Sequence, residues 1–555
     1  MDGETNNRRK TAEQLAEKQR DISISEFFAK NRHLLGFDNK RKSLLTTIKE
    51  AVDNSLDACE DAGILPEISV EIIEMSDDRY RVIVEDNGPG IVKKQVPNIF
   101  ARLLYGSKFH KLAQSRGQQG IGISAAVMYA QITTGRSAKI TSKTSKDKPA
   151  YYCELHIDTQ KNKPDITNEK EIEWFKDHGT KIELDLEGSY MKGSQSVDEY
   201  LKQTAITNPH VTIIYTNPKA EQLIFARAIE ELPPEPKEIK PHPEGVELGL
   251  MQKMLKYTEA RTLQSFLMND FSRIGSGTAK QICENASLLP NTKPSKMTRD
   301  MVEQLMKGIK LSKIIAPPTD CIIPIGEELI LKGLKKEVNA EFYSSVTRPP
   351  AVYRGNPFQI EVAMAYGGNL SSEGPINILR YANRVPLLYQ QGACAVTKSI
   401  VNTSWRNYGL SQSNGSLPQG PVSVVVHIAS VWVPFTSESK EAIAHYPEIL
   451  KEMKLALQEC GRKLGYYINK KKNVGKELKK RSYIEKYLPH VIDSIGEILS
   501  LSRVDKDRAT DNLKELLEKT RGKLDDMKFD PNKNEDYDED FAKIGKSDAE
   551  GEEDD

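Results

Sequence analysis

The chain has 555 residues, of which 38% are hydrophobic and 28% are charged, and its formal net charge is zero. This composition excludes a disordered chain, and the absence of a long apolar run excludes a membrane span. The length predicts three or four domains, and the lack of a signal peptide predicts a cytoplasmic protein. Six cysteines without any CxxC pair argue against a zinc site and against a disulfide framework.

The first informative segment is EAVDNSLD, Glu50 to Asp57, which predicts a helix with Glu50, Asn54 and Asp57 on one face. Glu50 is suited to polarise a water molecule. The neutral amide oxygen of Asn54 is suited to ligate Mg²⁺ beside a phosphate. A solvated acidic helix face is the alternative, and by itself this octet favours it.

The second segment, RYRVIVEDNGPGI, predicts an alternating strand from Arg79 that ends in a Gly/Pro turn at Ile91. Asp86 follows the strand, where its carboxylate can accept a hydrogen bond from an exocyclic amine. Gly88 and Gly90 would let the backbone approach a flat ring closely. The alternative is a plain hairpin turn, for which DNG is also a common signal.

The third segment, SRGQQGIGISAA, places Gly117, Gly120 and Gly122 before a small-residue apolar run that predicts a helix. Backbone N–H groups at a helix N-terminus favour an anion, so this segment is a candidate phosphate-binding loop. A flexible loop is the alternative. No Walker A pattern occurs in the chain, so any ATPase activity must rest on a different phosphate-binding design.

The middle of the chain predicts a linker and a small helical domain. Residues 231–245 hold five prolines in fifteen residues, which predicts an extended linker. Short helices are expected over residues 246–315, including one that begins after the turn in RIGSGTAKQI and carries Lys280. A nucleic-acid-binding helical domain and a purely structural one fit this segment about equally.

The C-terminal part predicts an α/β domain over residues 316–469, with helices at Glu438 to Tyr446 and Pro447 to Leu464. A helical stalk is expected over residues 470–524. Its segment KKKNVGKELKKR fits either a solvated helix face or a contact with a DNA backbone. Residues 525–555 carry fourteen Asp or Glu against four Lys, a net charge of minus ten, which leaves plus ten for residues 1–524. The tail is expected to be disordered, and the basic body suits nucleic-acid work.

Together the three motifs resemble, in order and spacing, the N, G1 and G2 boxes of the GHKL ATPase superfamily. HGTKIEL, at His178 to Leu184, looks like a further box, in which Thr180 lies near the adenine-binding aspartate. PFTSESKEAIAHYPEI, at Pro434 to Ile449, resembles the switch-lysine segment of the B subunits of DNA topoisomerase VI, the type IIB enzymes. With QRDISISEFFAKN and YGSKFHK, this resemblance runs from about Glu17 to about Thr520.

The resemblance implies a role for each matching residue. Glu50 and Lys440 correspond to the general base and the γ-phosphate sensor, which are the catalytic pair, and Lys440 also binds the nucleotide. Asn54 corresponds to the Mg²⁺ ligand and Asp86 to the adenine anchor. Further nucleotide-binding residues implied are Gly88, Gly90, Ser107, Lys108, Arg116, Gly117, Gln118, Gln119, Gly120, Ile121, Gly122, Ile123 and Thr180.

The resemblance also implies an α+β multidomain fold. Its parts would be an N-terminal strap (1–20), a GHKL ATPase α/β sandwich (21–230), the linker (231–245), a helix–two-turn–helix domain (246–315), a transducer (316–469), a stalk that contacts the A subunit (470–524) and the acidic tail (525–555). ATP and Mg²⁺ are the implied cofactors.

The implied partners are double-stranded DNA, a second B chain that dimerises on ATP binding, and an A subunit in an A2B2 heterotetramer. No tyrosine stands beside a DxD metal motif, so strand cleavage is expected in the A subunit. ATP-driven clamping would then gate double-strand passage, which relaxes supercoils and decatenates DNA. A chaperone or kinase of the same superfamily and a non-hydrolysing DNA-clamp scaffold are the alternatives.

Overall fold

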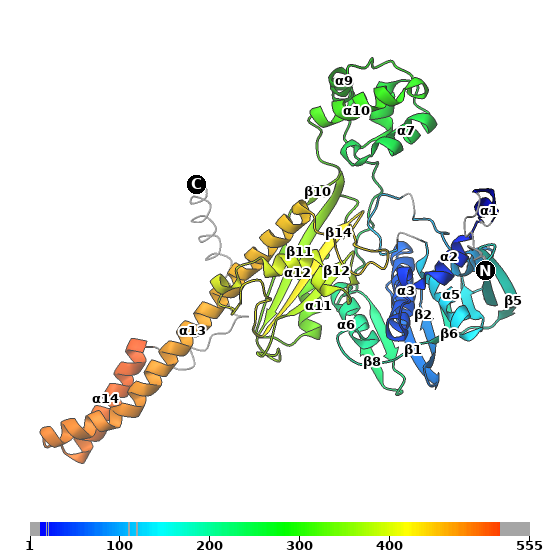
Figure 1. The fold of residues 1–555 in the computed structure, drawn as a ribbon. Coiled ribbons are helices and arrows are strands. Elements are labelled where there is room, and N and C mark those ends of the chain that lie inside the picture. Colours follow the sequence, from blue (N-terminus) through cyan, green and yellow to red (C-terminus); the bar gives the residue numbers. More distant parts are fainter. Residues whose placement is uncertain (1–11, 18, 20, 109–110, 118–119, 522–555) are drawn as a thin grey trace, which may run out of the picture.

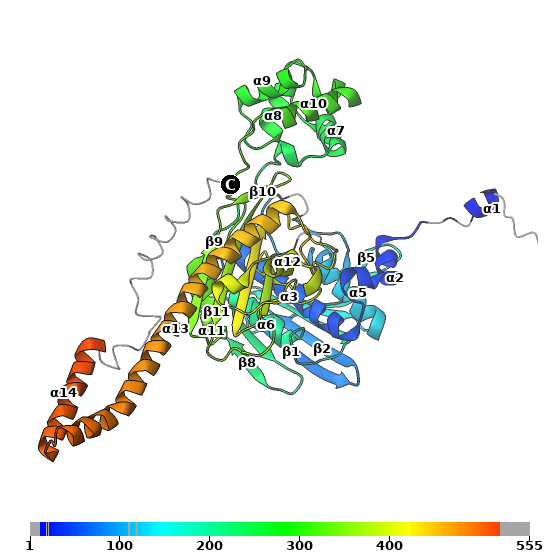
Figure 2. The same ribbon diagram turned by 60° about the vertical axis from the view of Figure 1, so that its left-hand side comes forward.

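The computed structural model describes residues 12–521 except residues 18, 20, 109–110 and 118–119 (Figure 1). Of the expected N-terminal strap, the helix α1 (Ala12–Ala16) is the main described part, and it lies away from the body of the molecule (Figure 2). The expected acidic tail, together with Gln118 and Gln119, lies outside the described residues.

The N-terminal domain is built on an eight-stranded sheet of order β5-β4-β3-β6-β2-β1-β7-β8, in which only β1 and β7 are parallel neighbours. Its strands are β1 (Glu67–Ser76), β2 (Arg79–Glu85), β3 (Ala138–Lys143), β4 (Ala150–Asp158), β5 (Lys163–Ile172), β6 (Gly179–Glu187), β7 (Thr212–Thr216) and β8 (Gln222–Phe225). The strand expected from Arg79 is confirmed as β2, and every second residue along it is buried.

Helices cover one face of this sheet. The long helix α3 (Lys40–Asp61) packs beside α5 (Gly122–Thr134) and α6 (Val197–Thr207). Around them lie α2 (Ile24–Lys30), the 3₁₀ helix η1 (Arg32–Leu35) and α4 (Val96–Ala101). The side chain of Asn39 caps α3 by accepting a hydrogen bond from the backbone N–H of Lys42. Leu44, Ile48 and Leu56 bury one face of α3, which leaves its opposite face open.

An extended segment without helices or strands leads from β8 towards the 3₁₀ helix η2 (Pro243–Gly245). Four helices then form a separate small domain with its own core: α7 (Leu248–Tyr257), α8 (Leu263–Asp270), α9 (Ser276–Asn285) and α10 (Arg299–Leu311), with η3 (Pro294–Lys296) between the last two. This domain stands apart from both sheets (Figures 1 and 2).

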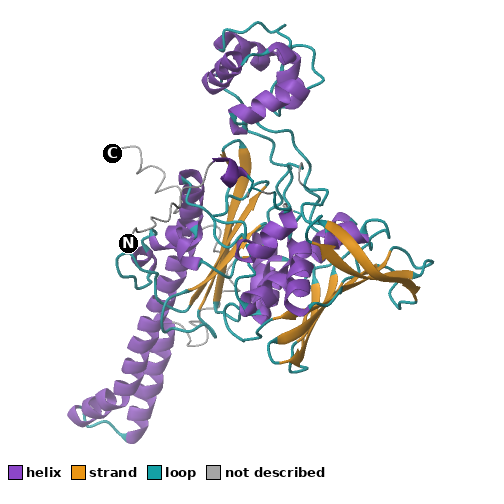
Figure 3. Cartoon of the chain, turned by 45° about the vertical axis from the view of Figure 1, so that its right-hand side comes forward, coloured by secondary structure: helices purple, strands orange, loops and turns teal. Residues whose placement is uncertain are grey.

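The third domain holds a six-stranded sheet of order β10-β11-β14-β12-β13, with β9 paired to β11. Its elements are α11 (Glu327–Glu337), β9 (Phe342–Thr347), β10 (Ala351–Tyr353), β11 (Asn356–Tyr366), β12 (Asn377–Ala382), β13 (Val385–Pro386), η4 (Gln391–Ala393), α12 (Ala395–Val401), η5 (Trp405–Tyr408) and β14 (Val422–Ser430). Every residue of β14 is buried, as expected for a core strand. The expected α+β architecture is therefore confirmed (Figure 3).

The last helices form an arm. The 52-residue helix α13 (Pro447–Ile498) packs on the third domain and then continues beyond it, and α14 (Arg503–Arg521) folds back against its far end (Figure 1). The sequence suggested a separate stalk from residue 470, but the helix is continuous from Pro447 through Gly475 and Pro489. No helix in the described part of the chain is long and apolar enough to cross a membrane.

Candidate active site

The open face of α3 forms one wall of a cavity of about 680 Å³. This volume lies within the range of small-molecule sites, about 300–1,000 Å³. Segments far apart in the sequence meet around it, namely residues 84–91, 105–108, 117, 120–123, 386–389 and 438–441, together with Thr180. The three sequence motifs thus line a single cavity, and the lysine segment of the third domain closes one side of it.

Asp86 lies at the buried end of the cavity, directly after β2. Its Oδ1 accepts hydrogen bonds from the backbone N–H groups of Gly88 and Thr180, at 2.9 and 3.0 Å, and its Oδ2 accepts one from Ser55 Oγ at 2.9 Å. Burial raises the pKa of this carboxyl despite the three donors. Each carboxylate oxygen has two lone pairs, so Oδ2 can accept one more hydrogen bond from a molecule in the cavity.

The glycines after Asp86 allow close backbone contact. Gly90 has a φ of +70°, and a Cβ there would lie 2.0 Å from the carbonyl oxygen of Lys143. The carbonyl oxygen of Gly88 lies 2.8 Å from Nδ1 of His178, in the HGTKIEL segment. A side chain at position 90 would therefore push apart the strand ends that hold Asp86 and Thr180 in place.

Glu50 lies in the middle of the open face of α3, against the first residue of α5. A Cβ at Gly122 would lie 1.7 Å from Oε2 of Glu50, so glycine is needed here for the Glu50 carboxylate to keep this position. The carboxylate is therefore held beside the N-terminus of α5, whose free backbone N–H groups favour anions. A water molecule placed between Glu50 and an anion at this helix end would be positioned for deprotonation.

Asn54 lies one helical turn further along α3 and is exposed to the cavity. Its Oδ1 lies 3.8 Å from the position of a Cβ at Gly117, the first glycine of the loop. Gly120, with a φ of +57°, and Ile121 continue the loop along the cavity wall, and Ile123 lines the wall at the start of α5. The described parts of the glycine loop thus pass over Asn54 and end beside Glu50.

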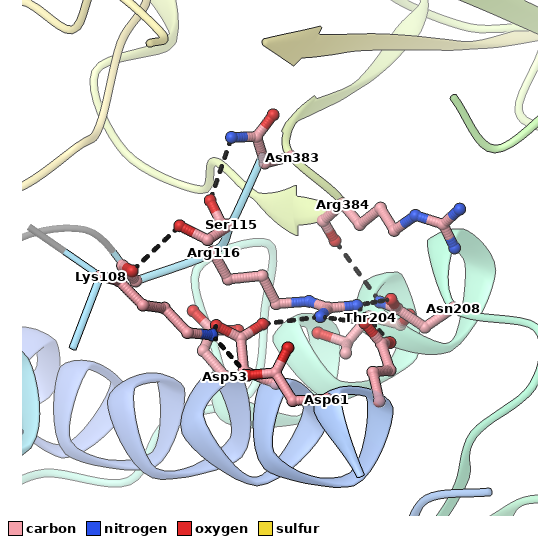
Figure 4. Close-up of polar contacts among 12 residues, drawn as sticks. Asp53, Asp61, Lys108, Ser115, Arg116, Thr204, Asn208, Asn383 and Arg384 are labelled. Carbon is pink, nitrogen blue, oxygen red and sulfur yellow. Dashed lines mark hydrogen bonds and ion pairs between the residues drawn. The ribbon is translucent and has the colours of Figure 1, made fainter. Parts of the chain in front are cut away.

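The side chain of Arg116 anchors the root of this loop (Figure 4). Its guanidinium donates hydrogen bonds of 2.7–2.8 Å to Asp57 and Glu60 of α3 and one of 2.5 Å to Oδ1 of Asn208. Burial alone would raise the pKa of Glu60, but Arg116 and His210 hold it below its ordinary value. The guanidinium is therefore engaged with protein groups beside the cavity.

The side chain of Lys108 also contacts carboxylates of α3, as the side chain of Arg116 does. Its Nζ lies 2.8 Å from Asp57 and 3.2 Å from Asp61, although burial would favour the neutral amine. The neighbouring Ser107 is exposed at the cavity edge. Both residues thus reach the cavity where the sequence placed them, and Lys108 is held by α3 in this conformation.

Lys440 comes from the third domain and enters the cavity opposite Glu50. Among the described residues, its Nζ has one hydrogen-bond partner, the carbonyl oxygen of Arg116 at 3.3 Å. Burial lowers the pKa of this amine, and the nearby carboxylate of Glu50 counteracts the effect. An incompletely solvated ammonium group in this position favours an anionic ligand.

The prediction of a helix from Glu438 to Tyr446 is wrong. Lys440 has a φ of +53°, which a right-handed helix excludes, and Phe435 pairs with Ile443 across the loop. Next to Lys440, Glu441 forms a buried ion pair with Lys42 of α3. This long-range contact and the turn stabilise a non-helical conformation, although the local sequence favours a helix.

Asp53, which lies between Glu50 and Asn54 and faces α6, was not among the predicted site residues. Tyr200 of α6 donates a hydrogen bond of 2.9 Å to its Oδ1, and burial raises the pKa of Asp53 to about 7. The helical periodicity of EAVDNSLD places Asp53 beside the open face, towards the protein interior. This position was the only indication in the sequence that Asp53 would be buried next to the site. Asn208, His210, Asn383 and Arg384 were also missed, and no local pattern distinguishes them.

The residues present fit ATP and Mg²⁺. The cavity offers a hydrogen-bond acceptor at Asp86, a glycine loop before a helix N-terminus, and the ammonium group of Lys440. The described residues contain no cluster of three or more His, Cys, Asp or Glu side chains for a metal. Mg²⁺ in nucleotide sites commonly takes one or two protein ligands and completes its shell with phosphates and waters, so Asn54 would suffice.

Two family models match the chain. Residues 39–186 match the histidine kinase-, DNA gyrase B-, and HSP90-like ATPase model, and residues 317–481 match the model of the topoisomerase VI B subunit transducer. The two matches cover the domains whose residues meet in the cavity.

Several curated proteins are similar over most of the chain. The B subunit of type 2 DNA topoisomerase 6 from Methanosarcina acetivorans is 53% identical over 489 residues, which cover 88% of this chain and 79% of that protein. The proteins of the same name from Archaeoglobus fulgidus and Pyrococcus furiosus are 47% and 39% identical, covering 88% and 85% of this chain and 81% and 90% of theirs. The chain therefore belongs to the family of B subunits of type 2 DNA topoisomerase 6, and it is an ATP-hydrolysing topoisomerase subunit with a GHKL ATPase domain and a transducer domain.

Proposed function

We propose that this chain binds ATP in the 680 Å³ cavity and uses its hydrolysis to drive passage of one DNA duplex through another, which an A subunit cuts. The observation that carries the proposal is the position of Lys440. A residue of the transducer domain lies in the same cavity as Glu50 and Asn54 of the ATPase domain, so a ligand there would contact both domains.

In the proposed reaction, Asp86 would accept a hydrogen bond from the adenine amine, and Thr180 would hold the carboxylate in place through its backbone N–H. Gly117, Gly120 and Gly122 would bring the backbone close to the phosphates. Glu50 would take a proton from the attacking water, and Lys440 would stabilise negative charge on the γ-phosphate. Mg²⁺, held on the protein side by Asn54, would neutralise phosphate charge when bound.

We propose that binding of ATP draws the transducer towards the ATPase domain, because Lys440 can contact the γ-phosphate only when it is present. A ligand shifts a conformational equilibrium by its difference in affinity for the two states, so ATP and ADP would favour different domain positions. Two B chains would dimerise through residues 1–20 and trap DNA. Genomic DNA as the substrate would place this activity in the cytoplasm.

The arm is the proposed contact with the A subunit. Ile484, Tyr487, Val491, Ile495 and Ile498 follow one face of α13 at intervals of three and four residues, and their exposed fractions range from 37% to 80%. An apolar stripe of this kind on an exposed helix suits burial against a partner. The helix runs from the transducer core to this stripe without a break, so a rotation of the transducer would move the arm as a lever.

The test is a relaxation assay with this chain, an A subunit, negatively supercoiled plasmid, ATP and Mg²⁺. ATP-dependent relaxation is expected, with no relaxation when either chain is omitted. The control is Glu50→Gln, which keeps the size of the side chain but removes the base. Relaxation without ATP, or an unimpaired Glu50→Gln chain, would contradict the proposal.

A further inference from the structure

The hairpin turn between β12 and β13 is buried against the ATPase domain. Asn383 and Arg384 form this two-residue turn, and they are only 6% and 4% exposed. Their φ angles are +48° and +68°, the pattern of a type I′ turn, in which glycine is usual at the second position. A left-handed conformation is strained for arginine, because its Cβ comes close to the following carbonyl oxygen. Such strain persists where the surroundings hold the residue firmly, and it points to a function for the turn.

Asn383 connects the transducer sheet to the root of the glycine loop. Its Oδ1 accepts a hydrogen bond from Ser430 N–H at 2.9 Å, and its Nδ2 donates to the carbonyl oxygen of Ser430 at 2.9 Å. The same Nδ2 donates to the carbonyl oxygen of Ser115 at 3.0 Å (Figure 4). Ser430 ends β14, the fully buried strand. Ser115 directly precedes Arg116, whose carbonyl oxygen is held by Lys440. Two consecutive carbonyl groups of the loop root are thus held by two transducer side chains.

Arg384 fixes the turn from both sides through its backbone. Its N–H donates to Nε2 of His427 at 3.0 Å, so the N–H of this imidazole is on Nδ1, 2.7 Å from Glu361. Its carbonyl oxygen accepts a hydrogen bond of 2.8 Å from the hydroxyl of Thr207, at the end of α6. His427 and Glu361 are completely buried in the transducer sheet, so the turn is a rigid part of that sheet.

We propose that the Asn383–Arg384 turn is a second positioning contact, separate from Lys440, through which the transducer holds the root of the glycine loop over the nucleotide. Lys440 would respond to the γ-phosphate, whereas Asn383 binds only protein. A movement of the transducer would therefore carry the Ser115 carbonyl, and with it the loop, whatever the state of the phosphate. This inference rests on the proposed function, because it concerns the loop that would cover ATP.

The test uses the full chain with Asn383→Asp, which keeps the acceptor for Ser430 N–H but replaces the donor to Ser115 with an oxygen. The substitution also removes the donor to the Ser430 carbonyl, so two buried hydrogen bonds are lost, and each corresponds to roughly a tenfold effect. We expect kcat for ATP to fall by about tenfold or more, with ADP affinity within about twofold of wild type. Amide exchange of residues 112–117 should rise in the presence of a non-hydrolysable ATP analogue. A role in stability alone would leave kcat and this exchange unchanged.

Asn377→Asp is the matched control, because Asn377 begins β12, the strand that leads into the turn, and its side chain donates to Ser423 within the transducer sheet. It should behave like wild type in all three measurements. If Asn383→Asp does not fold, a second pair of variants tests the same contact. Thr207→Val removes the hydroxyl that donates to the Arg384 carbonyl oxygen, and Thr207→Ser retains a hydroxyl. The valine variant should then lose turnover and the serine variant should keep it.

Wild-type kcat and loop exchange in Asn383→Asp, or equal losses in Asn377→Asp, would overturn the inference. The same holds if Thr207→Val and Thr207→Ser behave alike. Glu50→Gln, assayed alongside, separates this outcome from a failure of the proposed function. If Glu50→Gln keeps turnover, the site itself is wrong, whereas an inactive Glu50→Gln beside an unaffected Asn383→Asp contradicts only the second contact.

Discussion

The Nζ atom of Lys440 lies 3.3 Å from the carbonyl oxygen of Arg116, although 324 residues separate them in the sequence. The contact joins the transducer to the root of the glycine loop. A γ-phosphate near Glu50 would compete with a neutral carbonyl for a buried ammonium group, and charge favours the phosphate. If Lys440 exchanged the Arg116 carbonyl oxygen for a phosphate oxygen, the contact between the transducer and the root of the glycine loop would be released.

Replacement of the base should stop hydrolysis but preserve binding. For Glu50→Gln we expect turnover to fall by roughly 10²–10⁴-fold, the usual contribution of a positioned base. ATP affinity should stay close to wild type, because the side chain keeps its size beside Gly122. Steady-state phosphate release and a nucleotide titration measure the two quantities. Near-normal turnover would remove Glu50 from this role.

A methyl group at Gly122 should disturb the same carboxylate from the opposite side. In Gly122→Ala the new Cβ would lie 1.7 Å from Oε2 of Glu50, so Glu50 must move. We expect a loss of turnover of about 10²-fold or more, comparable to loss of the base. Gly277→Ala is the control, since Gly277 also lies in the first turn of a helix and has no atom within 4 Å of an added Cβ. Equal activity of the two variants would contradict the arrangement.

Adenine recognition should depend on Asp86. Asp86→Asn keeps an acceptor for the N–H groups of Gly88 and Thr180 but can place a donor opposite the adenine amine. Hydrogen bonds to charged groups contribute about 1.5–3 kcal/mol, so ADP affinity should fall roughly 10- to 100-fold. Calorimetric titration tests this. Asp61→Asn, at an exposed carboxylate on the same cavity, should bind ADP normally, and equal affinity of both variants for ADP would exclude the anchor role.

Lys440 should give the reaction an alkaline limit. Burial lowers the pKa of its amine, so the ammonium form is lost at a lower pH than for an exposed lysine. KM for ATP should therefore rise with increasing pH. Lys440→Arg stays charged throughout this range and should remove that rise, even if its kcat is lower. Parallel pH profiles for wild type and Lys440→Arg would show that another group causes the alkaline limit.

Asp53 should make stability depend on pH. Its pKa is raised from 3.8 to about 7 in the folded chain, so the folded state binds a proton that the unfolded state releases between these values. Stability should therefore decrease as pH rises from about 4 to about 7 and then level off. Asp53→Asn keeps an acceptor for Tyr200 without titrating. The difference between its thermal midpoint and that of wild type should increase in favour of the variant as pH rises from about 4 to about 7. A difference that does not change with pH would contradict a raised pKa of Asp53.

Local sequence patterns were sufficient to predict several parts of the site. The alternation of β2 and the helical face with Glu50 and Asn54 each follow from periodicity over a few residues. The spacing of Gly117, Gly120 and Gly122 also predicted the loop before α5, because glycines before an apolar run indicate the start of a helix. Hydrogen bonds within helices and between neighbouring turns act over short sequence distances, so local patterns carry this information.

The way in which the domains meet could not be predicted from local patterns. The helical preference around Lys440 was overridden by a turn with a positive φ and by the ion pair of Glu441 with Lys42. The burial that raises the pKa of Asp53 comes from the packing of α6. Asn383 contacts Ser115 across 268 residues, and nothing near either residue indicates the other. Such contacts depend on the docking of two folded domains, which is governed by the fit of whole surfaces rather than by the periodicity of any one segment.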